Sequence, residues 1–320
     1  MKLARAGGRW SLGCCLLALG LAAQAPAPGG ADAPKSQRQE PTFRVNVRLV
    51  NVFATVTDGR GAPVSGLTKD DFRVFEDGVQ QNISVFDQES ELPLNIALAI
   101  DTSGSTQRDF KLEVVSAKKF ASSIMRPLDH LAVFQITESI DQLTGFISSV
   151  RKIDEGIDSL RVGAGTSLYD GVFLCSEALI DREGRRVLVL ITDGGDTTSK
   201  ADYQGALRRA QQAEAIVYSI IVVPVAADAG RNIGGEHALI QISQDTGGKY
   251  YYAEGIEHLD EAFRQISTEL RMQYLLAYYS NRQTASSSFR RLEVQVNHQD
   301  AEGRQFQVRH RAGYYTAPAK

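Results

Sequence analysis

Cysteine and histidine are scarce in this chain. Two of its three cysteines, Cys14 and Cys15, lie close to the N-terminus, and only Cys175 remains once that stretch is removed. A single cysteine has no partner for an internal disulfide, and its apolar neighbours predict a buried, unreactive thiol. The five histidines are scattered and show no zinc-site spacing. These absences exclude a disulfide framework and a cysteine–histidine metal centre.

Catalytic and nucleic-acid-binding signals are also missing. The sequence has no Gly-x-Ser-x-Gly elbow, no His-Glu-x-x-His pair and no phosphate-binding glycine loop. The segment Asp101-Thr102-Ser103-Gly104 differs from the Asp-Thr-Gly of aspartic proteases by one serine, and no second copy completes the dyad. The net charge of −3 offers no basic excess for nucleic acid. We therefore expect a protein that is neither an enzyme nor a nucleic-acid binder.

A long apolar run occurs only near the N-terminus. Basic residues precede the apolar stretch 12–23, and a small-residue cleavage pattern ends at Ala25. A membrane span needs about 20 apolar residues, so a signal peptide at 1–25 is favoured over a membrane anchor. We expect an exported protein, periplasmic, cell-surface or secreted, without a transmembrane span in the mature chain. Residues 26–41, rich in Pro, Gly and Ala, predict a disordered linker.

The remaining chain shows three segments with different periodicity. Residues 42–91 and 272–316 predict antiparallel strands, too few in either segment to close a sandwich alone. Between them, residues 92–271 alternate buried apolar runs with helical periodicity. We therefore predict an α/β fold: a doubly wound, mostly parallel sheet with helices on both faces, inserted in or flanked by a small antiparallel β-sandwich.

Two local patterns make narrower predictions. Asp77-Gly78 stands between strand signals at 72–76 and 83–86, which predicts a hairpin that joins these strands through a type I′ turn. The segment Ser199-Lys200-Ala201-Asp202 predicts a capping box with Ser199 at the start of a helix.

Oxygen ligands follow a short apolar run in the segment 92–271. Asp101, Ser103 and Ser105 come directly after the buried run 94–100. Ligands of open α/β sheets bind at the carboxyl ends of the strands, so these side chains predict a site on one loop. Oxygen-only ligands suit Mg²⁺, Mn²⁺ or Ca²⁺ better than zinc.

The order Asp-x-Ser-x-Ser after a buried strand resembles the metal-ion-dependent adhesion site (MIDAS) of von Willebrand factor type A (vWA) domains. The family's second loop supplies a threonine, and Thr166 matches it just before a predicted helix. The family's third loop supplies an aspartate, and Asp193 matches it after a predicted apolar strand. The resemblance implies a divalent cation, Mg²⁺ with Mn²⁺ or Ca²⁺ as alternatives, with ligands Asp101, Ser103, Ser105, Thr166 and Asp193. Asp196, three residues after Asp193, either adds charge to this loop or caps a helix.

The layout of β segment, vWA segment and β segment resembles the VWFA-related family of bacterial exported proteins, as do Asp71-Phe72-Arg73-Val74 and Arg311-Ala312-Gly313-Tyr314. The resemblance implies binding of a protein partner that supplies an Asp or Glu carboxylate to the metal. Two alternatives stay open. One is a scaffolding module of an envelope complex in which the metal only stabilises the fold. The other is a metal-dependent hydrolase, which requires a general base that the sequence does not show near the loops.

Overall fold

The computed structural model describes residues 49–88, 92–103, 110–223, 232–280, 288–299, 303 and 305–316. All of them belong to the unit Asn46–Lys320, which is distinct from the unit Met1–Val45. The predicted leader at 1–25, the predicted linker at 26–41 and Ser105 lie outside the described residues. No helix in the described part of the chain has the length and apolar character of a membrane span.

Within the described residues, six strands form one sheet with the order β10-β9-β8-β5-β6-β7. Neighbouring strands are parallel, except that β7 runs antiparallel to β6 at the edge. The strands are β5 Leu94–Asp101, β6 His130–Ile136, β7 Ile140–Gln142, β8 Arg185–Thr192, β9 Ile216–Val222 and β10 Tyr250–Ala253. Every residue of β5 is buried, as expected for a strand that is covered on both faces.

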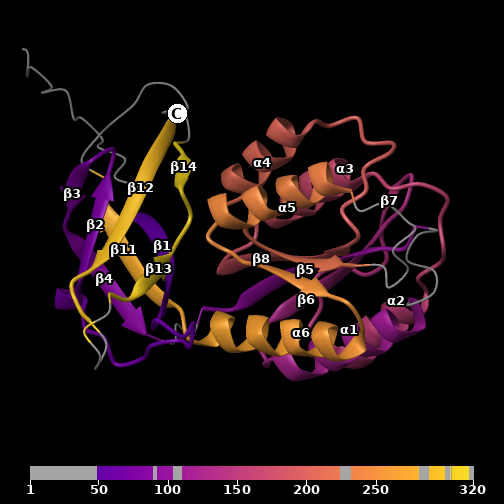
Figure 1. Ribbon diagram of the computed structural model, residues 1–320, viewed down its shortest axis with the longest axis horizontal. Coiled ribbons are helices and arrows are strands. Elements are labelled where there is room, and N and C mark those ends of the chain that lie inside the picture. Colours follow the sequence, from indigo (N-terminus) through magenta and orange to yellow (C-terminus); the bar gives the residue numbers. More distant parts are fainter. Residues whose placement is uncertain are drawn as a thin grey trace, which may run out of the picture. The chain divides into compact units, whose positions relative to one another are not determined.

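Helices cover both faces of this sheet (Figure 1). One face carries α1 Phe110–Ile124, α2 Val150–Asp158 and α6 Ile256–Arg271. The other carries α3 Leu168–Leu179, α4 Tyr203–Gln212 and α5 Ile233–Asp245. Side chains of β5 alternate between the two cores: Ile96 and Leu98 pack with the first set of helices, and Ala97 and Ala99 with the second. The predicted doubly wound, mostly parallel sheet is confirmed.

The other described strands form two four-stranded antiparallel sheets, with the orders β13-β1-β11-β4 and β14-β12-β2-β3. Before the parallel sheet come β1 Leu49–Thr57, the 3-10 turn Lys69–Asp71, β2 Phe72–Glu76, β3 Val79–Gln81 and β4 Ile83–Gln88. After it come β11 Tyr274–Tyr279, β12 Phe289–Val296, β13 Gln307–Arg309 and β14 Gly313–Tyr315. Apolar side chains of both sheets share one core. Each sheet combines strands from both ends of the chain, so the α/β part is inserted in a β-sandwich.

One predicted strand pairing is wrong. Asp77 and Gly78 have the positive φ angles of the expected turn, 48° and 78°. However, the turn joins β2 to β3, and β4 pairs with β11 in the opposite sheet. Gln81 and Ile83 are both buried on either side of the exposed Asn82. Because Gln81 pairs with Val74 of β2 and Ile83 pairs with Tyr278 of β11, the chain passes from one sheet to the other at Asn82 instead of continuing the hairpin.

A buried carboxylate joins the two flanks inside the sandwich. Glu76 of β2 is only 1% exposed. It accepts hydrogen bonds from the Tyr278 hydroxyl at 2.7 Å, the Tyr314 hydroxyl at 2.9 Å and the Ser280 hydroxyl at 2.8 Å. Burial and the neighbouring Glu76 carboxylate raise the pKa of Tyr314 to about 12, so its hydroxyl remains a donor at neutral pH. These bonds fix strands on either side of the insertion to one another.

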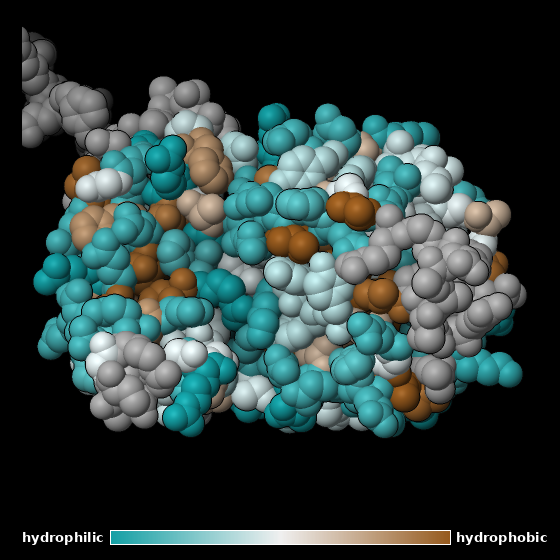
Figure 2. Space-filling model, in the orientation of Figure 1, coloured by the Kyte–Doolittle hydropathy of each residue, from teal (hydrophilic) through white to brown (hydrophobic). Residues whose placement is uncertain are grey.

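The face drawn in Figure 2 is mostly hydrophilic, and apolar residues stand on it in small separate groups. Isolated apolar residues are normal on a protein surface. The described residues of this face therefore form no wide apolar area.

A histidine of the sandwich is held in its neutral form. Nε2 of His310 accepts a hydrogen bond from the Val294 backbone N–H at 3.1 Å, and Nδ1 lies 2.8 Å from the Arg311 carbonyl oxygen. An accepting Nε2 places the ring proton on Nδ1. Burial lowers the pKa of His310 below its ordinary value of 6.5, although the Arg311 carbonyl and the Glu293 charge act in the opposite direction.

We expect acid to weaken the sandwich through His310. Because the folded-state pKa is depressed, this stabilisation is complete above the unfolded-state pKa and is lost as pH falls through the folded-state pKa. Urea unfolding from about pH 7.5 to about pH 5 should show a steeper loss of unfolding free energy in the wild type than in His310→Gln. Parallel pH profiles for the two proteins would contradict this expectation.

Candidate metal centre

Asp101 is the last residue of the central strand β5 and is fully buried, with 0% exposure. Its Oδ1 accepts a hydrogen bond from the Ser103 backbone N–H at 3.0 Å, and its Oδ2 accepts one from the Thr192 hydroxyl at 2.7 Å. Burial, with a smaller contribution from the charge of Asp193, raises the pKa of Asp101 to about 6 against these hydrogen bonds. A nearby cation favours the charged form of such a carboxylate, so this environment suits a bound metal ion.

The loop after Asp101 is held by its neighbours. The Thr102 backbone N–H donates to the Ile136 carbonyl at 3.0 Å, and its hydroxyl donates to the Arg161 carbonyl at 2.7 Å. Ser103 is 4% exposed. The predicted ligand Ser105 lies outside the described residues. The first loop therefore leaves β5 with Asp101 and Ser103 both buried at the carboxyl end of the sheet.

Thr166 lies in a second loop that is bound to the third. The Thr197 hydroxyl accepts a hydrogen bond from the Thr166 backbone N–H at 2.9 Å and donates to the Thr166 carbonyl at 3.2 Å. The Thr197 backbone N–H donates to the same carbonyl at 2.8 Å. Within the described part of the chain, no hydrogen bond involves the Thr166 hydroxyl. The threonine is thus fixed by its backbone, and its hydroxyl is left for a ligand role.

Asp193 follows β8 and is half-buried. Its Oδ1 accepts a hydrogen bond from the Gly195 backbone N–H at 2.9 Å. The intervening Gly194 has a positive φ of 85°, and a Cβ there would lie 3.2 Å from the backbone nitrogen of Glu236 in α5. A glycine therefore allows the third loop, which carries Asp193, to pack against α5.

Asp196 is a helix cap. Its Oδ1 accepts hydrogen bonds from the Leu168 backbone N–H at 2.8 Å, at the start of α3, and from the Ser199 hydroxyl. The prediction that Ser199 caps the next helix is wrong. The N-cap of α4 is Asp202, whose side chain accepts a hydrogen bond from the Gly205 N–H at 2.7 Å. Ser199 is three residues too early, and its hydroxyl is already engaged by Asp196.

Three side chains that the sequence analysis did not single out support the loops. Thr192 holds Asp101, and Thr197 holds Thr166. Glu138, between β6 and β7, accepts hydrogen bonds from the backbone N–H groups of Ala164 and Gly165, at 3.1 and 3.3 Å. Hydrogen bonds from its own backbone and from these two residues lower the pKa of Glu138. The role of Thr192 could have been predicted from the sequence, because it is the neighbour of Asp193. No local sequence pattern indicates the roles of Thr197 and Glu138.

The donor set differs from a carboxylate-rich or histidine-rich metal site. No group of three or more His, Cys, Asp or Glu side chains that could hold a metal occurs among the residues that the structure describes. The candidate centre combines the carboxylates of Asp101 and Asp193 with neutral hydroxyls. Hard oxygen donors of this kind suit Mg²⁺, which retains part of its water shell. The residues present therefore fit the predicted ion.

We expect Thr197→Val to lower the affinity for Mg²⁺ by roughly tenfold, because outer-shell hydrogen bonds orient metal ligands. Valine has a similar shape but can neither donate to nor accept from Thr166. Thr197→Ser retains the hydroxyl and should bind nearly as the wild type does. Isothermal titration calorimetry measures both. Equal affinities of the valine and serine variants would show that this contact does not position Thr166.

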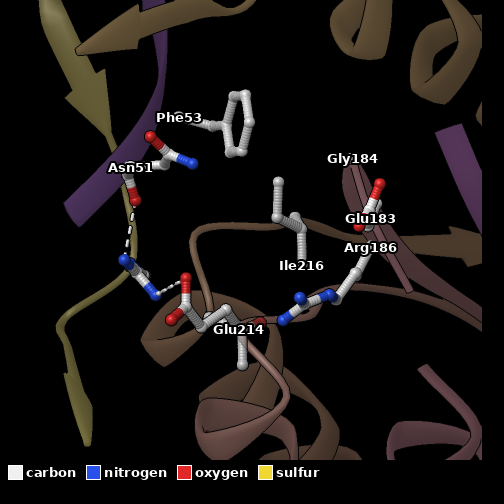
Figure 3. Close-up of a pocket in the computed structure, with 9 residues that line it drawn as sticks. Asn51, Phe53, Glu183, Gly184, Arg186, Glu214 and Ile216 are labelled. Atoms are coloured by element: carbon white, nitrogen blue, oxygen red, sulfur yellow. Dashed lines mark hydrogen bonds and ion pairs between the residues drawn. The ribbon is translucent and has the colours of Figure 1, made fainter. Parts of the chain in front are cut away.

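A cavity of about 220 Å³ lies near the amino-terminal ends of the parallel strands (Figure 3). Its lining includes Arg186 and Ile216, which stand at the beginnings of β8 and β9. Arg311 lies 3.0 Å from a Glu214 carboxylate oxygen and donates to the Asn51 carbonyl at 2.6 Å. Asp101 and Thr192 lie at the carboxyl ends of their strands, so this cavity takes no part in the candidate metal centre.

Comparison with known proteins agrees with this fold. The vWA protein of Catenulispora acidiphila is 12% identical with a TM-score of 0.50, over 78% of this chain and 74% of that one. Proximal thread matrix protein 1 from the mussel byssus, solved with a zinc-occupied MIDAS motif, is 17% identical with a TM-score of 0.51. That match covers 62% of this chain and 50% of the mussel protein. At such identities the likeness concerns the fold alone.

No curated protein matches the chain. The family model of the von Willebrand factor type A domain matches residues 95–265, which is more than half of the sequence. These residues run from the second position of β5 into α6 and include Asp101, Thr166 and Asp193. The chain therefore belongs to the von Willebrand factor type A domain family.

Proposed function

We propose that this vWA protein binds a protein partner through a divalent ion, held by Asp101, Ser103, Ser105, Thr166 and Asp193. The observation that carries the proposal is the buried Asp101 carboxylate at the end of the central strand, whose pKa is raised to about 6 by burial and by the neighbouring Asp193. Two carboxylates largely balance a divalent charge. Mg²⁺ suits this donor set best, and Mn²⁺ and Ca²⁺ share its preference for oxygen.

The chain's own residues hold the site ready for a ligand. Thr192 and the Ser103 backbone orient Asp101, and Thr197 fixes the loop that carries Thr166. When bound, the ion supplies a coordination position for a carboxylate of the partner. Because the serine and threonine hydroxyls are neutral and weak donors, an Asp or Glu of the partner adds the strong anionic donor that the site lacks.

We propose binding without a catalytic step. Two acidic residues beside the loops are already engaged by backbone donors: Glu138 by Ala164 and Gly165, and Asp196 by Leu168. A general base must be able to reach the proton that it removes, and a carboxylate used as a backbone acceptor is poorly suited to that role. We also propose that the protein works after export, as the N-terminal leader pattern suggests.

The test is capture of a partner from an envelope extract by the immobilised protein, in Mg²⁺ and in excess chelator. We expect capture to require the ion and to be lost in Thr166→Ala, whereas Thr166→Ser, which retains the hydroxyl, captures the partner. A partner held equally well in chelator would overturn the proposal. Thermal unfolding of the same proteins distinguishes partner binding from the scaffolding alternative. If the metal only stabilises the fold, the α/β part should unfold in chelator.

A further inference from the structure

Glu138 places a fixed carboxylate beside the second loop of the candidate metal centre. Its Oε2 accepts hydrogen bonds from the backbone N–H groups of Ala164 and Gly165, at 3.1 and 3.3 Å. On the other side of Thr166, the Ser167 hydroxyl donates to the Glu138 carbonyl at 3.1 Å. Because a backbone nitrogen is about 1.5 Å from its Cα and successive Cα atoms are about 3.8 Å apart, Glu138 Oε2 lies within about 9 Å of the Thr166 Cα.

The second loop leaves room for this side chain. A Cβ added at Gly163 would lie 3.1 Å from Glu138 Oε2 and 2.4 Å from the Thr137 Cγ2. The glycine therefore allows the carboxylate to approach the loop closely. Since two backbone donors hold the carboxylate, the Glu138 side chain has already lost conformational freedom before a ligand arrives.

The Glu138 carboxylate is exposed and charged. Hydrogen bonds from its own backbone and from the second loop lower its pKa. Within the part of the chain that the structure describes, no lysine or arginine forms an ion pair with it. Arg161, the described cation nearest to this loop in sequence, donates instead to the carbonyls of Asp158 and Leu160, at 3.0 and 2.7 Å. A negative charge is thus held in place beside Thr166.

This charge acts on whatever approaches the metal. The carboxylates of Asp101 and Asp193 largely balance a divalent ion, whereas Glu138 adds a charge that the ion does not offset. Its distance from Thr166 is no more than about one Debye length at physiological ionic strength. We propose that Glu138 selects partners in which a lysine or arginine accompanies the acidic residue that binds the ion. This inference rests on the proposed function.

The expected contribution of Glu138 is modest but measurable. Exposed ion pairs contribute little when two flexible side chains must both be ordered. Glu138 is ordered beforehand, so only the cation of the partner loses freedom. We therefore expect this pair to strengthen binding about fivefold. A second acidic residue of the partner at the same place would instead be repelled.

Two parallel selections of a displayed peptide library test the proposal. The library carries a fixed central Asp with random flanking residues. It is selected in saturating Mg²⁺ on the full chain and on Glu138→Gln, then eluted with EDTA. Glutamine retains an oxygen acceptor for the Ala164 and Gly165 N–H groups and removes the charge. We expect Lys and Arg to be enriched beside the Asp on the wild type and not on Glu138→Gln.

Glu183→Gln is the matched control. It removes an exposed carboxylate that lies before the amino-terminal end of β8, at the opposite end of the strand from the candidate metal centre. The control should enrich the same basic residues as the wild type. Equal enrichment of Lys and Arg on the wild type and on Glu138→Gln would overturn the inference.

A selected peptide then gives the magnitude by calorimetry in saturating Mg²⁺. Replacing its basic residue by glutamine should weaken binding to the wild type about fivefold and leave binding to Glu138→Gln unchanged. The inference is overturned if this replacement costs the same on both proteins, or if it costs nothing on the wild type. The second of these results does not depend on how well the variant folds.

The outcomes distinguish this inference from the proposed function. EDTA-eluted peptides without a preference for basic residues would overturn the inference and leave metal-dependent binding intact. If the chain binds Mg²⁺ but yields no EDTA-eluted peptide, or if it binds no Mg²⁺, both the inference and the proposed function are overturned.

Discussion

Replacing Asp101 by alanine is expected to abolish divalent-ion binding and leave the fold intact. Loss of an outer-shell partner commonly costs 10- to 100-fold in metal affinity, so loss of a buried carboxylate ligand should cost at least about a hundredfold. The fold should survive because burial already disfavours the charged Asp101, whose pKa is raised to about 6. Removal of this charge offsets the loss of an acceptor for the Thr192 hydroxyl and the Ser103 N–H.

Calorimetry with Mg²⁺ measures the loss of ion binding, and thermal unfolding in chelator measures whether the fold is retained. Asp181→Ala is the matched control, because it removes one exposed carboxylate that lies before the amino-terminal end of β8, at the opposite end of the strand from the candidate metal centre. The control should bind as the wild type does. If Asp101→Ala retained wild-type Mg²⁺ affinity, the metal site would have to be assigned to other residues.

A chain that ends after Met272 is expected to keep its α/β part folded and to lose the sandwich. β1 lies between β13 and β11, and β2 pairs with β12, so the truncation removes strand neighbours from both sheets. It also removes Tyr278 and Tyr314, which donate to the buried Glu76. The strands that remain cannot bury an apolar face on their own, and Glu76 would be left without these donors.

Hydrogen exchange followed by mass spectrometry distinguishes the two parts. Amides at residues 49–88 should exchange as in an unfolded chain, whereas those of β5 and β8 remain protected. In the full-length chain, Tyr278→Phe removes one hydroxyl and serves as the control. It should lower the unfolding free energy by about 1–3 kcal/mol and retain protection throughout. Persistent protection of 49–88 in the truncated chain would show that this segment folds alone.

Local sequence was sufficient where one element carries its own signal. The apolar run 94–100 predicted a strand covered on both faces, and β5 is buried along its whole length. The nine-residue helix α2 was not predicted, because its buried apolar side chains are only Ile153 and Ile157, too few for a clear period. The hairpin partner of β2 was wrong because β3 has only three residues, too few for a period of its own, whereas the clearer strand signal at 83–86 belongs to β4, which pairs with β11 from the other end of the chain.

The sequence by itself determined the alternation of strands and helices that gives the parallel sheet, although α2 was missed, and the positions of Asp101, Thr166 and Asp193 relative to the elements around them. Apolar periodicity and residues at strand ends are local properties, so they can be read without the fold. Only the tertiary structure decided that Thr192 holds Asp101 across 91 positions and that Thr197 holds Thr166 across 31. It also decided which strands from the two ends of the chain become neighbours within each sheet of the sandwich. These contacts join residues far apart in sequence, and their partners are selected by burial and hydrogen bonding in the folded chain, which no local pattern encodes.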